Sequence, residues 1–174
     1  MDIDRSGECQ CKSVKFDVKG QVMLNALCHC GTCCYNRSMS PVHVMVVAFF
    51  ESLTITEGEE KLSKYETETA EHGFCSICGV MVYQTLKERT EGKDYVTIMP
   101  TNFHIENKDC KDGRRKLPED YLPQLHINYQ ERHYDWSDDL PKCITWPPGT
   151  AYPFGGMCDN NGVPLLKEGC PDET

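Results

Sequence analysis

The amino-acid sequence predicts a mainly β domain that is stabilised by bound metal. Short segments rich in β-branched and aromatic residues recur along the 174-residue chain, with turn-forming residues between them. No long stretch repeats its apolar residues with the 3.6-residue period of a helix. The chain also has 12 cysteines and only 39% hydrophobic residues. A core of this size often depends on a metal or a disulfide for part of its stability.

The expected strands begin near the N-terminus. Val14, Phe16 and Val18 alternate with charged residues, which is typical of a strand with one buried face. The other expected strands are residues 42–50, 53–56, 79–83, 95–98 and 125–129. One short helix is expected after Cys33 and another near residues 118–122.

The composition changes at about residue 147. Residues 1–146 hold all of the expected strands and are predicted to form one zinc-binding domain. Residues 147–174 are dense in Pro and Gly and have no periodic apolar pattern. They are predicted to form an irregular C-terminal tail.

The net charge, the N-terminal segment and the apolar run of residues 42–50 argue against nucleic acid and membrane partners. A net charge of -9 at pH 7 argues against nucleic acid, since phosphate binding needs a basic surface. The N-terminal MDIDRSGECQC has no apolar targeting segment, and the apolar run of residues 42–50 is far below the roughly 20 residues of a membrane helix. We therefore expect a cytoplasmic protein with no membrane partner, where clustered cysteines more often bind metal than form disulfides. The oligomeric state stays open, a homodimer included.

Seven cysteines fall into three short clusters. Residues 9–11 read CQC, residues 28–33 read CHCGTC and residues 75–79 read CSICG. A C-x-x-C pair followed by glycine is typical of zinc sites, because glycine accepts the positive φ that turns backbone N–H groups toward sulfur. One pair alone is weak evidence, whereas three clusters interleaved with strands are strong evidence.

Seven ligands divide naturally into a set of four and a set of three. A closed set of four is structural, whereas three protein ligands leave the open position that catalytic zinc requires. The set of three, whose members lie close enough in sequence to bind one ion alone, is Cys28, Cys30 and Cys33. The set of four is then Cys9, Cys11, Cys75 and Cys78. The alternatives are a disulfide framework for the set of four, and a second purely structural zinc completed by Cys34 or a tail cysteine.

The order of these motifs resembles the glutathione-dependent formaldehyde-activating enzyme family, which includes centromere protein V. The resemblance covers residues 7–141 and rests on GECQC, VKF, CHCGTC, FCSICG and PQLHI with a later Trp136. It implies a zinc-containing β-tent fold, with one structural zinc and one active-site zinc on the same two cysteine sets. This chain departs from the family at Ser38, usually a glycine, at His72 and Gly73, where a basic residue is common, and in Cys34 and the tail. The fold and metal sites therefore carry over better than the substrate.

The set of three favours thiol chemistry. Three thiolates on Zn²⁺ leave a formal charge of about -1, which makes the ion a poorer Lewis acid toward water than zinc held by three histidines. An entering thiol would instead be held as a nucleophilic thiolate. We predict a zinc-dependent carbon–sulfur lyase or synthase with two Zn²⁺ cofactors. The resemblance implies glutathione as co-substrate and formaldehyde as the small carbonyl compound.

Two other functions stay open. One is a tailoring enzyme that uses the open zinc as a Lewis acid on a larger biosynthetic metabolite. The other is a non-catalytic, zinc-stabilised binding module.

Further residues are assigned around the set of three. Arg37 is the best candidate to bind the anionic glutathione, and Arg132 is a weaker one, more often a solvated surface residue. His126 is assigned to the catalytic site with the three cysteines, although a core histidine is the usual occupant of such a strand. His29 is expected to orient its loop by hydrogen bonding, and His72 to be either a surface residue or a proton shuttle. Cys34 is expected to be buried, and four cysteines without ligand spacing are expected to be free thiols: Cys110, Cys143, Cys158 and Cys170.

Overall fold

A computed structural model describes residues 1–48, 50–68, 70–86, 95–105, 117–147, 157–158 and 164–165. The chain forms two compact units, each built from two segments. Unit 1 consists of Met1–Asn25 and Val44–Leu122, and unit 2 consists of Ala26–His43 and Pro123–Thr174. The mainly β fold predicted from the sequence is confirmed. Most of residues 147–174 lie outside the described residues, so the boundary of the tail stays a prediction.

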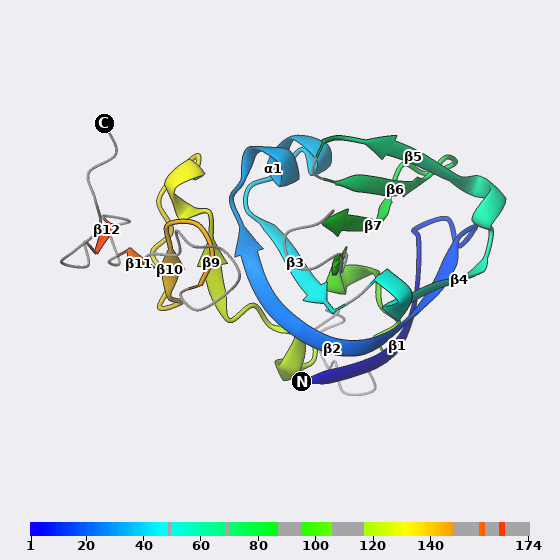
Figure 1. The fold of residues 1–174 in the computed structure, drawn as a ribbon, viewed down its shortest axis with the longest axis horizontal. Coiled ribbons are helices and arrows are strands. Elements are labelled where there is room, and N and C mark those ends of the chain that lie inside the picture. The colour runs from blue at the N-terminus through cyan, green and yellow to red at the C-terminus, as the bar shows by residue number, and fades with distance from the viewer. Residues whose placement is uncertain are drawn as a thin grey trace, which may run out of the picture. The chain divides into compact units, whose positions relative to one another are not determined.

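Antiparallel strands make up unit 1. The long strand β2 (Lys15–Cys28) pairs with β1 (Asp2–Glu8) on one side and with β4 (Leu53–Glu57) on the other. A second antiparallel series runs in the order β3 (Val42–Val47), β8 (Tyr95–Ile98), β7 (Met81–Leu86), β6 (Glu71–Cys75) and β5 (Leu62–Glu66). Figure 1 shows β5, β6 and β7 side by side. Single 3₁₀ turns connect some strands: Phe50–Ser52, Glu59–Lys61, Pro100–Asn102 and Glu119–Tyr121.

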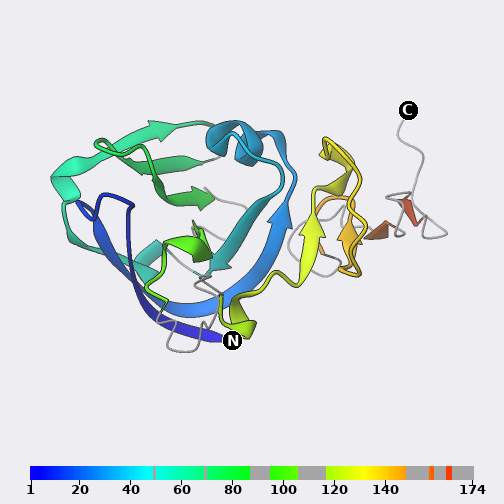
Figure 2. The same cartoon turned by 180° about the vertical axis from the view of Figure 1, so that it is seen from behind.

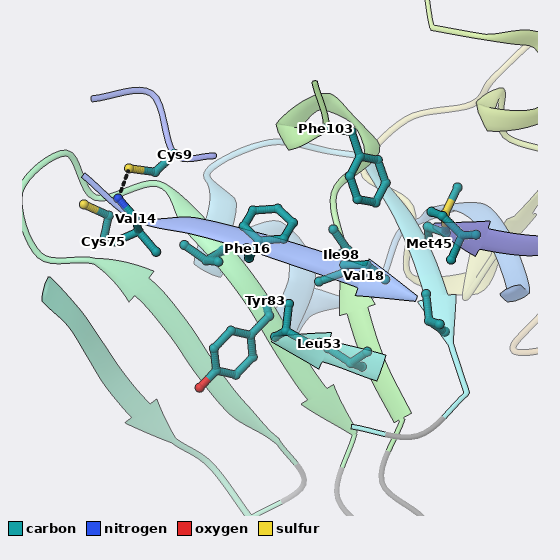
Figure 3. Packing of buried hydrophobic residues seen from close by; sticks show 14 of the residues in the cluster. Cys9, Val14, Phe16, Val18, Met45, Leu53, Cys75, Tyr83, Ile98 and Phe103 are labelled. Carbon is teal, nitrogen blue, oxygen red and sulfur yellow. Dashed lines mark hydrogen bonds between the residues drawn. The ribbon is translucent and has the colours of Figure 1, made fainter. Parts of the chain in front are cut away.

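The core of unit 1 is built on alternating residues at the start of β2 and just before it. Val14, Phe16 and Val18 are completely buried, as the alternation predicts. The ring of Phe16 packs on that of Phe103, with 6.2 Å between their centroids (Figure 3). The same core cluster includes the side chains of Cys9 and Cys75, so two metal-ligand candidates are part of the packed interior.

Unit 2 is smaller and more polar inside. Its strand β9 (Leu125–Ile127) pairs in parallel with the last residues of β2 and with β10 (Lys142–Cys143). Strands β11 (Met157–Cys158) and β12 (Pro164–Leu165) continue from β10 in antiparallel fashion, and Figure 2 shows β9 beside β10. The helix α1 (Gly31–Arg37) and the 3₁₀ turn Tyr129–Glu131 complete the described part of this unit.

The predicted elements are largely present, with shifted ends. Strand β8 has the predicted bounds, β4 extends one residue further, and β3, β7 and β9 overlap their predicted ranges. The helix expected after Cys33 begins earlier, at Gly31, so that Cys33 lies inside it. The sequence did not predict β1, β5 or β6 as strands. The segment DIDRSGE of β1 is mostly polar and buries only two of its residues, so its periodicity carries little signal.

Substitution of Phe16 by alanine tests the core of unit 1. The ring fills a completely buried position, so its loss should lower the free energy of unfolding by about 3–5 kcal/mol. Met23→Ala is the control, because Met23 lies on the same strand and is 52% exposed; it should change stability by about 0.5 kcal/mol or less. Urea denaturation followed by near-ultraviolet circular dichroism measures both. Equal losses would contradict the described packing.

Candidate metal centres

The set of four cysteines, called the first cluster from here on, lies in unit 1, where two hairpin turns meet. Cys9 and Cys11 lie in the turn between β1 and β2, and Cys75 and Cys78 lie at the turn between β6 and β7. The four Sγ atoms lie within 4.8 Å of one another. The Sγ atom of Cys11 is 3.5 Å from that of Cys9 and 3.7 Å from that of Cys75. A zinc–sulfur bond of about 2.3 Å gives tetrahedral sulfur–sulfur edges of about 3.8 Å, so this donor set fits a tetrahedral metal ion.

The turns adopt unusual backbone angles that direct these sulfur atoms. Gly79 has a φ of 72°, and its N–H donates to the carbonyl oxygen of Cys75 over 2.8 Å. The positive φ predicted for this glycine is therefore confirmed. In the other turn Lys12 takes a φ of 61°, and the N–H of Val14 donates to the Sγ atom of Cys9 over 3.4 Å (Figure 3). Backbone N–H groups that face sulfur stabilise a thiolate and thus favour metal binding.

The second cysteine cluster lies in unit 2, where β2 passes into α1. Cys28 is the last residue of β2, Cys30 is the N-cap of α1 and Cys33 lies in its first turn. Their Sγ atoms lie within 4.8 Å of one another, and those of Cys28 and Cys30 are 3.4 Å apart. Cys28 and Cys33 are buried, whereas Cys30 is partly exposed. Among the described residues no further cysteine, histidine or carboxylate joins this set of three.

The charges of the second cluster are coupled. Hydrogen bonds from Cys28 and then Cys33, together with the positive charge of Arg37, lower the pKa of Cys30 to about 3. The hydrogen bond to Cys30 is the main cause that raises the pKa of Cys28 well above its usual value. A thiolate on Cys30 therefore disfavours a second thiolate on Cys28. A metal ion is what would allow all three to be thiolates.

Ser38, one of the departures from the family pattern, ends α1. It has a φ of 50°, and its N–H group bonds to the carbonyl oxygens of Cys34 and Tyr35. A left-handed residue at the end of a helix is most often glycine, since other side chains are strained there. Serine nevertheless closes the helix in the same way, so this departure leaves the backbone of the site intact.

A segment after β9 holds the cysteine loop in place. The side-chain amide of Asn128 donates to the Sγ atom of Cys28 over 3.5 Å. The carboxylate of Glu131 accepts from the N–H of Gly31 over 2.9 Å, which satisfies one of the free donors at the start of α1. The sequence analysis did not identify Asn128 or Glu131. Their partners lie about a hundred residues away in the chain, and the only local signal is an asparagine, a residue that tolerates the left-handed φ of 52° found there.

The histidines form a buried hydrogen-bonded series behind the loop. His29 and His126 are completely buried, and Nε2 of His29 lies 2.8 Å from Nδ1 of His126. Nε2 of His126 in turn lies 2.9 Å from the carboxylate of Asp138, which also bonds to Lys142 over 3.0 Å. The expected role of His29, to orient its loop by hydrogen bonding, agrees with this arrangement. Asp138 and Lys142 were not identified from the sequence.

The remaining candidates lie in different environments. Arg37 is half-buried in the last turn of α1, the helix that carries Cys33. Arg132 instead bonds to Asp135 over 2.6 Å, and its guanidinium lies 4.7 Å from the centroid of the Tyr129 ring.

Two other expectations concern buried side chains. Cys34 is buried, as expected, with its Sγ atom 3.5 Å from the carbonyl oxygen of His29 and outside the cluster of three. The surface position considered for His72 is wrong: this side chain is 1% exposed and stacks on Tyr65 in unit 1, because its strand β6 has neighbours on both sides. Cys143 is buried. Cys110, Cys170 and the side chain of Cys158 lie outside the described residues.

Comparison with known families identifies the chain. The family model described as glutathione-dependent formaldehyde-activating enzyme matches residues 4–119, which is more than half of the 174 residues. The chain belongs to this family. The matched segment contains all seven clustered cysteines and ends before Asn128 and the residues around His126.

One solved structure shows a weaker likeness. It is the crystal structure of a Rhodobacter sphaeroides protein, 21% identical, and the match covers 59% of this chain and 91% of that one with a TM-score of 0.46. Among the described residues, no helix has the length and apolar character needed to cross a membrane.

Metal analysis tests the two clusters separately. Purified protein should contain two metal ions per chain, measured by inductively coupled plasma mass spectrometry. Cys75→Ser removes one sulfur of the first cluster and Cys30→Ser one of the second, so each variant should lose one ion. Cys143→Ser is the control, since this thiol belongs to neither cluster, and it should keep both. One ion in the unaltered protein would contradict the assignment.

Proposed function

We propose that this protein is a zinc-dependent carbon–sulfur lyase or synthase that forms and cleaves the adduct of glutathione with formaldehyde. The observation that carries the proposal is the cluster of three sulfur atoms in a member of this family, with Cys30 partly exposed. A Zn²⁺ ion on three thiolates would offer a fourth position that favours a thiol ligand in its deprotonated form. The first cluster, with four sulfur atoms, is proposed to hold a structural zinc.

The chain around the cluster of three moderates its negative charge. The amide of Asn128 donates to Cys28, and the backbone N–H of Cys33 donates to Cys30 over 3.4 Å. The charge of Arg37 acts on both Cys30 and Cys33. These donors stabilise thiolate ligands, and they reduce the repulsion that an anionic thiol would meet as it approaches.

Arg37 is proposed to bind a carboxylate of glutathione. It is the basic residue of α1 whose charge reaches the cluster, and a guanidinium pairs well with a carboxylate. Arg132 is less suited to this role, because its guanidinium already bonds to Asp135 and lies on the ring of Tyr129.

His126 is proposed to position the site rather than to contact the substrate. Its side chain is completely buried, and both ring nitrogens lie within hydrogen-bond distance of protein groups. A residue in direct contact with substrate needs a free nitrogen that faces the site.

A larger carbonyl compound is the second candidate substrate. Three large side chains of unit 2 are notably exposed, Tyr35 at 83% and Met39 and Tyr134 at 54% each. Tyr35 lies on α1 and Met39 follows it, so apolar surface adjoins the segment that carries the cluster. Such surface would suit a substrate with an apolar part better than formaldehyde alone.

Two-dimensional exchange NMR tests the reaction. A mixture of glutathione and formaldehyde should show faster exchange between free thiol and S-hydroxymethyl adduct when protein with two bound ions is added. Cys30→Ser should abolish the acceleration, and Cys143→Ser should retain it. If the unaltered protein leaves the exchange rate unchanged, formaldehyde is not the substrate, and acceleration with a larger aldehyde would favour the second candidate. Failure with every aldehyde would leave a binding module.

A change of thiol tests the role of Arg37. Arg37→Gln should raise the KM for glutathione by about tenfold or more, since a charged hydrogen bond is worth about 1.5–3 kcal/mol. The KM for 2-mercaptoethanol, which has no carboxylate, should stay within about twofold. Steady-state rates with both thiols give the comparison. Equal effects on the two thiols would show that Arg37 acts on the cluster instead of on the carboxylate.

A further inference from the structure

The buried series behind the cysteine loop fixes the position of each proton. The carboxylate of Asp138 is an acceptor, since hydrogen bonds from His126 and Lys142 outweigh its burial and hold its pKa below the usual value. Nε2 of His126 therefore donates to it over 2.9 Å. The buried ammonium of Lys142 already balances the charge of this carboxylate over 3.0 Å, so His126 stays neutral in its buried position and its Nδ1 is an acceptor. The lowered pKa of His126, which is caused mainly by burial, agrees with this.

The same logic extends to His29. Its Nε2 lies 2.8 Å from Nδ1 of His126, which has no proton to donate. Nε2 of His29 must then carry the proton, and Nδ1 of His29 carries a lone pair. This Nδ1 atom is buried and makes no hydrogen bond with any of the described residues. It belongs to the residue between Cys28 and Cys30.

We propose that Asp138 is a positioning residue that acts through His126 to hold His29 in the Nε2-protonated tautomer, so that Nδ1 of His29 is a hydrogen-bond acceptor within the cysteine loop. The partner that fits this atom is a hydrogen-bond donor, either a water molecule or a hydroxyl group. The assignment of tautomers does not depend on the proposed function.

Lys142 makes the effect of substituting Asp138 predictable. Lys142 is 1% exposed, and its ammonium donates to Oδ1 of Asp138 over 3.0 Å. The backbone N–H of Leu140 also points to this oxygen, over 3.3 Å. In Asp138→Asn both donors keep the amide oxygen at the Oδ1 position. The NH₂ group then takes the Oδ2 position, which is the nearer of the two to Nε2 of His126, at 2.9 Å against 3.1 Å for Oδ1. A proton on Nε2 would point at a proton of the amide there, so Nε2 is expected to become the acceptor.

A single oxygen-to-NH₂ change should thus reverse two tautomers. Nε2 of His126 would become an acceptor, and its proton would reside on Nδ1. Nε2 of His29 would then accept from His126, and the proton of His29 would move to its Nδ1. The acceptor within the cysteine loop would become a donor.

Long-range ¹H–¹⁵N NMR of the metal-containing protein measures the tautomers directly. Both rings should be Nε2-protonated in the unaltered protein and Nδ1-protonated in Asp138→Asn. Asp139→Asn removes the same charge at the neighbouring exposed residue and should leave both tautomers unchanged. Nδ1 protonation in the unaltered protein, or unchanged tautomers in Asp138→Asn, would overturn the proposal.

Two further variants separate the tautomer effect from the loss of a buried ion pair. Asp138→Asn/Lys142→Met removes both charges and should still reverse the tautomers, because Leu140 orients the amide. Lys142→Met alone should not reverse them. If Asp138→Asn alone does not fold, the double variant and Lys142→Met provide the test. Tautomers that are not reversed in the double variant would contradict the proposal.

Metal affinity and turnover give two other readouts. Loss of a group that orients a metal-site loop typically weakens metal affinity or activity by about 10–100-fold. Competition with a chelator should show this loss at the cluster of three and not at the cluster of four. Slower exchange of the glutathione adduct would link Nδ1 of His29 to the proposed reaction. If the tautomers reverse while adduct exchange is absent in every variant, the proposed function fails and the positioning role stands.

Discussion

Repulsion between closely spaced sulfur atoms is the constraint on which both metal centres depend. At the Sγ separations of 3.4–3.7 Å found here, each pair of thiolates would cost about 5 kcal/mol at an effective dielectric constant of 20. A cation between the sulfur atoms removes this cost and converts it into attraction. Metal binding at these segments would therefore be coupled to their folding.

The two clusters use this coupling differently. The first brings Cys9 and Cys11 to a turn more than 60 residues further along the chain, so an ion bound there would close a long loop and act as a cross-link within the core of unit 1. The second joins residues that lie within six positions of one another. An ion there closes almost no loop and can add little stability as a cross-link. This difference favours a chemical role for the ion at Cys28, Cys30 and Cys33.

The two groups of cysteines could be predicted from the sequence, whereas their surroundings could not. Short spacings such as CSICG show which cysteines act as a pair, because they limit where the chain can direct its sulfur atoms. The division of seven cysteines into four and three then joined pairs that lie more than 60 residues apart. The alternation of Val14, Phe16 and Val18 identified β2 for the same local reason. By contrast, His29 meets His126 across 97 positions, and the carboxylate of Asp138 gains its role only through that contact. An aspartate in a polar loop looks the same in a sequence whether it is solvated or bonded to a buried ring.

Contacts from outside the helix explain how the seven-residue helix α1 can hold Cys33 in place. A helix as short as α1 is unstable alone, and it depends on groups outside itself. Glu131 binds its first turn, and Asn128 and the histidine series hold the residues that precede it. These groups follow the segment of residues 4–119 that defines the family. The segment matched by the family model therefore supplies the sulfur atoms, and a later part of this chain holds the loop of the second cluster in place.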